Sequence, residues 1–271
     1  LLEGFFDGVV SLIQELRDSG CRARIAVGGV MPSLAPEHVA VQMPDVQFIC
    51  RGAGEYFLPE LVRIVGQTDL DTPLSTTQLN ALSQLRGLIV RDPAGKAMVS
   101  AASDQIVSVE TLDNSTLDLS VLQPRHIEGG IEISTSRGCI HRCTFCSILG
   151  RESYQARSVD SIFEVLARYQ RRFEALYGDQ IPPNAWRVHI SDDDFACEKE
   201  RATLFFKRLL ETPFRLSSVQ VSVADLCLRK DGSLLPEPDM ELLDAIRPEC
   251  FADQQRRFPD TDYVADFRSR R

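Results

Sequence analysis

The fold of this chain follows from residues 131–147, which read IEISTSRGCIHRCTFCS. The first five of these residues predict a β-strand. The loop that leaves this strand carries three cysteines at spacings of four and three, Cys139, Cys143 and Cys146. Because one short loop brings all three thiolates to one point, we expect a single site that binds one metal centre.

Strand and helix patterns alternate after the cysteines. The predicted elements, in the order helix, strand, helix, strand, helix, lie at 158–176, 186–191, 197–210, 219–224 and 238–246. A strand followed by a helix three times is typical of a parallel (β/α) barrel. Region 131–250 predicts part of such a barrel, because a complete one needs more strands. We expect an unpaired edge at 219–224 and an irregular tail at 251–271.

The N-terminal residues 1–66 show a second alternation of helix and strand patterns. Apolar residues from Leu2 to Leu16 recur at spacings of three and four, which predicts an amphipathic helix. The predicted strands 24–27 and 46–50 are each followed by a glycine turn and a helical stretch. This order predicts a doubly wound α/β domain.

Residues 67–130 differ in character from both neighbouring regions. Polar residues at 68–78 predict a linker, and 85–98 predicts a β-hairpin around the turn 92–95. We therefore expect this region to be a connector between two α/β parts of the chain.

The composition is that of an ordinary globular protein. The chain has 271 residues, 44% hydrophobic and 25% charged, and its mean hydropathy is -0.11, which excludes disorder as the main state. Thirty Lys and Arg against 39 Asp and Glu leave a net charge of -9. This balance gives no strong signal of nucleic-acid binding. No apolar run approaches the roughly 20 residues of a membrane helix, so we expect no membrane partner.

The eight cysteines are expected to be reduced. The N-terminus lacks the basic leader and the small-residue cleavage site of a signal peptide, and a chain of this length does not need disulfides for stability. We therefore expect a cytoplasmic protein. The absence of an initiator Met suggests that the sequence is the inside of a longer protein.

Three thiolates in one loop suit either iron-sulfur or zinc chemistry. A structural zinc site needs a fourth ligand, and the local alternative, His141, lies inside the loop between two of the cysteines. Three ligands on a four-iron cluster would instead leave one iron open for a substrate or cofactor.

The cysteine motif resembles that of the radical S-adenosylmethionine family, C-x3-C-x2-C with an aromatic residue before the last cysteine, which is Phe145 here. The resemblance implies that Cys139, Cys143 and Cys146 hold a 4Fe-4S cluster whose open iron is chelated by S-adenosylmethionine. It also implies that Phe145 packs near the adenine. Ile140 departs from the family, since many relatives have Pro at that position.

An acidic cluster, HISDDDF at 189–195, ends the next predicted strand, where barrel folds place their sites. It resembles the position at which the family contacts the amino group of S-adenosylmethionine, which implies Asp192 first and Asp193 second. Its Asp-Asp-x-Phe pattern is similar to that of the cobalamin-binding branch. Alternatively, the acids favour the dipole of the following helix, and Asp194 is the best candidate for its N-cap.

The N-terminal part resembles the second half of a cobalamin-binding Rossmann-like domain. The residues that carry this likeness, which the resemblance places near the nucleotide tail of cobalamin, are Gly28, Gly29, Gly52, Gly54 and Glu55. Glycines permit the backbone to approach a ligand closely. A loop that could supply a lower histidine ligand is not found in this sequence.

The sequence therefore predicts the C-terminal part of a Rossmann-like cobalamin-binding domain followed by a partial radical S-adenosylmethionine barrel. The resemblance implies an enzyme that cleaves S-adenosylmethionine reductively, with cobalamin carrying a methyl group and a flavodoxin or ferredoxin donating electrons. The small-molecule or peptide substrate is not identified, and no side chain is assigned a catalytic role. Two alternatives remain, a methylthiotransferase-like enzyme without cobalamin and a zinc or iron-sulfur binding module without turnover.

Overall fold

A computed structural model describes residues 5–66, 68–91, 97–99, 107–114, 118–141, 143–148, 153–227, 233, 235 and 237–252. The chain divides into two compact units. The first comprises Leu1–Val107 and His141–Arg151, and the second Ser108–Ile140 and Glu152–Arg271. Among the described residues, no helix combines the length and the apolar character that a bilayer crossing requires.

The first unit is built on a mixed sheet in the order β1-β2-β3-β4. Its strands are β1 (Ala26–Val27), β2 (Phe48–Cys50), β3 (Leu88–Arg91) and β4 (Ala97–Val99). The pair β1 and β2 is parallel, whereas β2, β3 and β4 pair antiparallel. The strands predicted near 24–27 and 46–50 and the predicted hairpin are thus confirmed. The predicted turn 92–95 lies outside the described residues.

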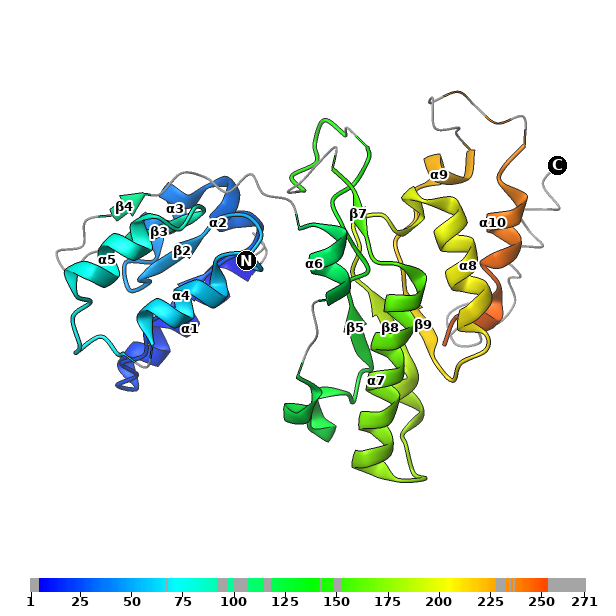
Figure 1. The fold of residues 1–271 in the computed structure, drawn as a ribbon, viewed down its shortest axis with the longest axis horizontal. Helices are drawn as coiled ribbons and strands as arrows, with labels where there is room; N and C mark the ends of the chain where they lie inside the picture. Colours follow the sequence, from blue (N-terminus) through cyan, green and yellow to red (C-terminus); the bar gives the residue numbers. More distant parts are fainter. Residues whose placement is uncertain are drawn as a thin grey trace. The chain divides into compact units, whose positions relative to one another are not determined.

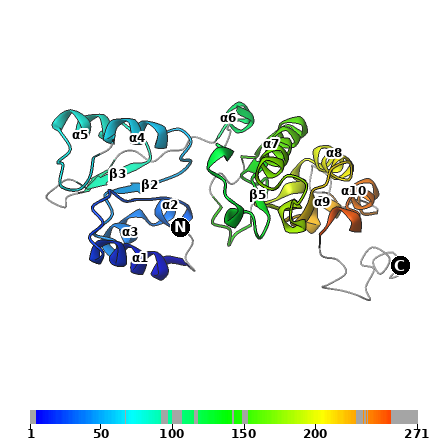
Figure 2. The same cartoon turned by 90° about the horizontal axis from the view of Figure 1, so that it is seen from below.

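Helices cover both faces of this sheet (Figure 2). The helices of this unit are α1 (Phe6–Asp18), α2 (Val30–Leu34), α3 (Pro36–Gln42), α4 (Leu58–Val65) and α5 (Thr76–Ser83). Phe48 packs in one core with residues of α4 and α5, and its neighbour Ile49 packs in another with residues of α1 and α3. Because successive side chains of a strand point to opposite faces, a sheet buried on both sides needs an apolar run.

The expected connector 67–130 is in part integral to this unit. The hairpin pairs with β2, and the end of the predicted linker is the start of α5, where Ser75 and Gln78 form a capping box. Leu82 of α5 is fully buried. The capping pattern of Ser75 and Gln78 is hard to recognise in the sequence, because the polar residues around it are typical of both linkers and helix starts.

The second unit contains a parallel sheet in the order β5-β8-β9 (Figure 1). Its strands are β5 (Ile131–Ile133), β8 (Arg187–Ile190) and β9 (Arg215–Ser218). Helices α7 (Val159–Tyr177), α8 (Lys199–Leu209) and α10 (Met240–Ala245) cover one face. The short elements are α6 (Val109–Asn114) and α9 (Val223–Cys227), with 3-10 turns at Leu119–Val121, Pro124–His126, Pro183–Trp186, Phe195–Cys197 and Pro248–Cys250. The predicted order of strands and helices is confirmed here.

The third predicted strand, 219–224, was wrong in position. The strand is β9, four residues earlier in the chain, and Leu216 in it pairs with Val188 of β8. Alternating valines at 219–223 imitate a strand, but Val223 is 74% exposed and begins α9, whereas Leu216 is fully buried. The expected free edge is partly paired, because the Ala252 amide donates to the Leu216 carbonyl. The rest of the predicted tail, 253–271, lies outside the described residues.

Gly130 lets β5 begin directly beside β8. Its φ is 99°, and a Cβ at this position would lie 2.5 Å from the carbonyl oxygen of Arg187. Only glycine tolerates both the backbone angle and the close approach. The glycine thus sets the parallel register Ile131 to Val188, which brings the carboxyl ends of β5 and β8 side by side.

Candidate functional site

The three cysteines lie in a loop that is closed at its base. The chain leaves β5 and continues as β6 (Ser136–Arg137), which pairs antiparallel with β7 (Gln155–Ala156) where the chain returns. Residues 138–154 between these two strands are called the cysteine loop below. Its two ends are therefore held at the carboxyl edge of the parallel sheet, where α/β folds place their sites.

The three cysteines differ in exposure. Cys139 is buried, Cys146 is half-buried and Cys143 is exposed, and none of the three forms a disulfide. The Cys146 amide donates to the Cys143 carbonyl at 3.1 Å, and the Ile148 amide donates to the Cys146 Sγ at 3.5 Å. Cys139 belongs to the second unit and the other two to a segment of the first, so the convergence of the three thiolates stays a prediction.

Phe145 stands in the turn between the second and third cysteines. Phe145 is 90% exposed, more than any other large hydrophobic residue among the described residues. A ligand that covers an exposed phenyl ring removes apolar surface from water, which is favourable. The exposure is compatible with the predicted role beside an adenine, which stays a prediction.

Asp192 is buried behind the start of the cysteine loop, with an exposed fraction of 2%. Its Oδ1 accepts from the amides of Thr135 and Ser136 at 2.6 and 3.0 Å, and its Oδ2 accepts from the Thr135 hydroxyl. The carboxylate thus binds the chain itself at the carboxyl ends of β5 and β8. Because both oxygens of Asp192 already accept hydrogen bonds from the protein, Asp192 is not the first choice for binding the amino group of a cofactor.

Asp193 is the exposed member of the acidic cluster. Partial desolvation and the neighbouring charge of Asp192 raise the pKa of its carboxyl, while Arg137 and a hydrogen bond from the Gly138 amide oppose the rise. Its carboxylate therefore lies at the start of the cysteine loop, next to the residue that precedes Cys139.

Asp194 caps a helical turn, as the alternative interpretation predicted. Its side chain accepts from the Ala196 amide at 3.3 Å, so it caps the 3-10 turn Phe195–Cys197 and not α8 itself. It also accepts from the Ser222 amide at 3.4 Å. A carboxylate oxygen of Asp194 and the Cys139 Sγ lie within 4.8 Å of each other, so the acidic cluster and the first cysteine share one place in the fold.

Cys197 lies near this pair, a position that the sequence did not reveal. Burial raises the pKa of its thiol, and the charges on Asp194 and Cys139 raise it further, whereas a hydrogen bond from the Ile140 amide lowers it. Cys197 stands alone in the sequence, outside the cysteine motif, so no spacing marks it. Its place two residues after Phe195, just beyond the Asp-Asp-x-Phe segment, was the available signal.

Arg201 of α8 is a second residue that sequence reasoning missed. Arg201 is buried, with an exposed fraction of 8%. It donates to the Thr135 carbonyl and hydroxyl at 3.0 and 2.6 Å, to the Arg157 carbonyl at 2.8 Å and to the Tyr154 hydroxyl at 3.2 Å. Its Cζ also stands 5.1 Å from the centre of the Phe195 ring. Nothing in the local sequence distinguishes this arginine from surface arginines of a helix.

The face of the parallel sheet that the helices leave uncovered carries a polar row. In register across the three strands stand Glu132, His189 and Ser218, and the His189 Nδ1 and the Ser218 hydroxyl form a hydrogen bond. Their alternation with buried Ile131, Ile133 and Ile190 is the period of a strand with one wet face. The sequence alone does not show that these three residues are neighbours, because this depends on the register of the strands.

The first unit brings the two predicted glycine turns together. They follow β1 and β2, which are parallel neighbours, and the Ser33 hydroxyl joins them by donating to the Gly29 carbonyl at 2.6 Å and accepting from the Gly52 amide at 2.9 Å. Gly29 and Gly52 have φ of 106° and 84°. A Cβ on Gly54 would meet no atom within 4 Å, whereas one on Gly28 would meet the Cβ of Cys50 at 3.4 Å.

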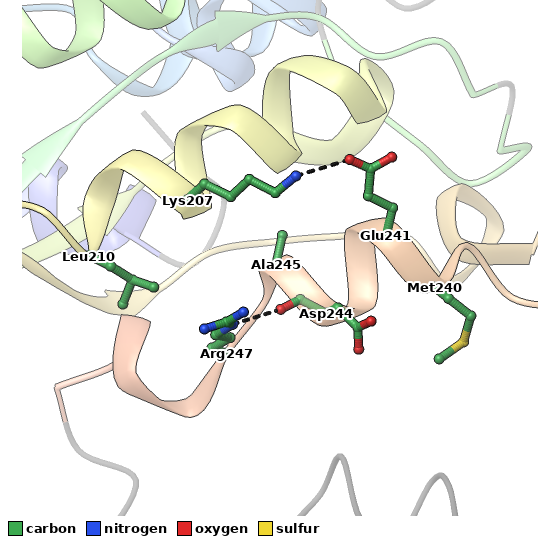
Figure 3. A pocket seen from close by; sticks show the side chains of 7 residues that line it. All are labelled: Lys207, Leu210, Met240, Glu241, Asp244, Ala245 and Arg247. Carbon is green, nitrogen blue, oxygen red and sulfur yellow. Dashed lines mark hydrogen bonds and ion pairs between the residues drawn. The ribbon is translucent and has the colours of Figure 1, made fainter.

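A surface cavity of about 540 Å³ between α8 and α10 is a less suitable candidate site (Figure 3). It is lined by Lys207, Leu210, Met240, Glu241, Asp244, Ala245 and Arg247. Lys207 pairs with Glu241 at 3.0 Å, and Arg247 donates to the Asp244 carbonyl. The cavity lies at the C-terminal half of α8, so it is at the amino end of the strands, where α/β folds rarely place their chemistry.

Comparisons with solved structures give similar folds at low sequence identity. No protein-family model and no curated protein matches the sequence. The cobalamin-dependent S-adenosylmethionine radical enzyme OxsB with aqua-cobalamin bound is similar over 90% of this chain, with a TM-score of 0.59 and 22% identity. The radical S-adenosylmethionine methyltransferase TsrM from Kitasatospora setae, with tryptophan substrate and aza-SAM bound, is similar over 91%, with a TM-score of 0.54 and 17% identity.

These likenesses establish a shared fold. The chain spans 32% of the OxsB chain and 51% of the TsrM chain. The mixed α/β architecture with a parallel sheet is therefore that of a part of cobalamin-dependent radical S-adenosylmethionine enzymes, and the sequence-based expectation of this fold is confirmed at that level.

Proposed function

We propose that this chain is part of a cobalamin-dependent radical S-adenosylmethionine enzyme that methylates or otherwise modifies its substrate by radical chemistry. One observation carries the proposal: a C-x3-C-x2-C loop follows β5 in a fold similar to those of OxsB and TsrM. The motif comes from the sequence and the likeness from the fold, so the two support the same chemistry independently.

Cys139, Cys143 and Cys146 would hold a 4Fe-4S cluster. None of the three forms a disulfide, and thiolates are the donors that iron-sulfur clusters use. When bound, the cluster supplies the single electron for reductive cleavage of S-adenosylmethionine. The protein's own contribution would be the loop after β5, which carries these three cysteines and no fourth one.

Asp193 and Phe145 would bind S-adenosylmethionine. Asp193 is exposed, whereas Asp192 is buried against Thr135 and Ser136, so the expected order of the two aspartates is reversed in this proposal. A carboxylate binds an ammonium group by a charge-assisted hydrogen bond. The exposed Phe145 ring offers an apolar surface for an adenine.

The glycine turns after β1 and β2 would line a cobalamin site. Gly29 and Gly52 have positive φ, a conformation that favours glycine, and a Cβ on Gly54 would meet no atom within 4 Å. Glu55 is exposed beside them, while Gly28 packs on Cys50. This arrangement fits a large ligand that contacts backbone. When bound, cobalamin carries the methyl group.

Turnover would need an electron donor of the flavodoxin or ferredoxin type, and the substrate would be a small molecule or a peptide. The polar row Glu132, His189 and Ser218 on the uncovered face of the sheet would face that substrate, since the helices occupy the other face.

Metal and cofactor analysis of the chain tests the proposal. After anaerobic reconstitution we expect about four irons and four sulfides per chain, and a visible spectrum that changes when cobalamin is titrated. One zinc per chain and no iron would favour the binding module and overturn the proposal. A full cluster without cobalamin binding would favour the methylthiotransferase-like enzyme.

A further inference from the structure

The cysteine loop is held by side chains that are not part of it. Thr135 immediately precedes β6 at the start of the loop, and Tyr154 and Arg157 flank β7 at its end. The Arg157 amide donates to the Thr135 carbonyl at 2.8 Å. This bond and the short pairing of β6 with β7 are the only backbone links across the base among the described residues, so the base needs further support.

Arg201 supplies this support from α8. Its guanidinium binds the start of the loop through the carbonyl and hydroxyl of Thr135, and the end of the loop through the Arg157 carbonyl and the Tyr154 hydroxyl. A guanidinium holds its donors in a rigid planar fork and so fixes several acceptors in one geometry, whereas the donors of a lysine ammonium rotate. Burial raises the pKa of Tyr154, so its hydroxyl stays neutral beside the guanidinium.

Asp192 supports the same threonine from β8. The Thr135 hydroxyl donates to Asp192 and accepts from Arg201, so it links a buried carboxylate to a buried guanidinium. Removing one member of such a buried network leaves an uncompensated charge or an unpaired polar group. The three residues Thr135, Asp192 and Arg201 are called the loop clamp below.

We infer that the loop clamp is a positioning device that fixes Cys139 before any metal is bound. Cys139 follows Thr135 by four residues and is 7% exposed, whereas Cys143 is exposed. The first cysteine is thus preset by the protein, and the other two lie on the part of the loop that the clamp does not touch. What the loop binds rests on the proposed function, but the preset position of Cys139 does not.

The rate of Cys139 alkylation in the metal-free protein tests this inference directly. We use iodoacetamide with mass-spectrometric readout and compare Arg201→Gln with Arg208→Gln. Arg208 is a matched control, because it also lies on α8, stacks on a phenylalanine and binds α7, yet does not touch the loop. We expect Cys139 to react about tenfold or more faster in R201Q, as the loss of hydrogen bonds to a charged group implies, and at the wild-type rate in R208Q.

Cys143 and Cys250 provide internal controls. Cys143 is already exposed and should react at an unchanged rate, and Cys250, fully buried in the same unit, reports global opening. If Cys139 keeps its wild-type rate in folded R201Q, or if Cys250 accelerates in parallel with Cys139, the positioning role is refuted.

A second pair of variants decides the question if R201Q does not fold. Thr135→Val removes the hydroxyl that joins Asp192 to Arg201, and Thr135→Ser retains it. We expect fast Cys139 alkylation in T135V and rescue to near the wild-type rate in T135S. Equal rates in the two variants would refute the linking role of the hydroxyl.

The same variants separate this inference from the proposed function. In reconstituted protein we expect R201Q to lose iron several-fold faster in air than R208Q, because one ligand is no longer preset. A chain that binds no iron contradicts the proposed function and leaves the alkylation result standing. A chain that binds a full, equally stable cluster in both variants, with unchanged Cys139 alkylation, contradicts the clamp alone.

Discussion

Replacing Asp192 by alanine should destabilise the second unit far more than the same change at the neighbouring Asp193. Asp192 is 2% exposed and accepts three hydrogen bonds from Thr135 and Ser136. Alanine leaves two buried amides without this acceptor and removes the carboxylate to which Arg201 is linked through Thr135. Losing one partner of a buried polar network costs about 3–5 kcal/mol.

The exposed Asp193 has no comparable role in the fold. We expect Asp193→Ala to change the free energy of unfolding by no more than about 0.5 kcal/mol, as is usual for exposed positions. The two variants differ by one position in sequence and remove the same chemical group. Their comparison therefore isolates the effect of burial and hydrogen bonding.

Urea denaturation followed by tryptophan fluorescence measures this difference. The chain has a single tryptophan, Trp186, which contacts Phe173 and Phe214 in the core of the second unit. Its emission therefore reports on the unit that contains Asp192. A loss below about 1 kcal/mol in D192A, or an equal loss in D193A, would refute the structural role given to Asp192.

Four further predictions concern ligand binding, the pH dependence of stability, packing and the metal ligands. Because burial and Asp192 raise the pKa of Asp193, S-adenosylmethionine affinity should fall as the pH drops through this raised pKa, and calorimetry should find no such dependence in Asp193→Asn. The raised pKa of Asp193 also affects stability. The stability that Asp193 contributes is present below about pH 3.8, its ordinary pKa, and is lost as the pH rises through its pKa in the folded protein. Chemical denaturation at neutral pH should therefore find D193N no less stable than wild type. Gly130→Ala should lower the free energy of unfolding by about 3 kcal/mol or more in urea denaturation, because its Cβ would lie 2.5 Å from a carbonyl oxygen. Gly178→Ala is the control, since Gly178 also has positive φ but has free space around it, and it should cost roughly 1–2 kcal/mol. Equal losses of stability in the two variants would contradict the close approach at Gly130. Cys143→Ala should lose most of the reconstituted iron and Cys21→Ala none, and a C143A protein with full iron would remove Cys143 from the ligand set.

Much of the fold could be predicted because it depends on local patterns. The strands before the glycine turns and before the cysteines are apolar runs next to residues that stop a strand, and the helices have regular apolar spacing. The third strand was misplaced because the valines at 219–223 alternate as a strand does. The burial of Leu216 against β8 decides its true position, and this packing is not visible locally.

The site could be predicted only where its chemistry is local in sequence. Three cysteines within one loop reveal themselves by spacing. The clamp joins Thr135 to Asp192 and to Arg201, which lie 57 and 66 residues further along the chain, so no short motif carries it. For Asp192 and Asp193 the sequence places two carboxylates side by side, but it does not show that Asp192 is buried and Asp193 exposed.

The electron paramagnetic resonance spectrum of the reduced protein, before and after addition of S-adenosylmethionine, tests the central claim most directly. If Cys139, Cys143 and Cys146 hold a four-iron cluster with one open iron, S-adenosylmethionine will alter the cluster signal, and the alteration will need higher concentrations in D193N. A cluster signal that is the same with and without S-adenosylmethionine would mean that all four irons are already fully ligated. The chain would then be an iron-sulfur module without radical S-adenosylmethionine chemistry.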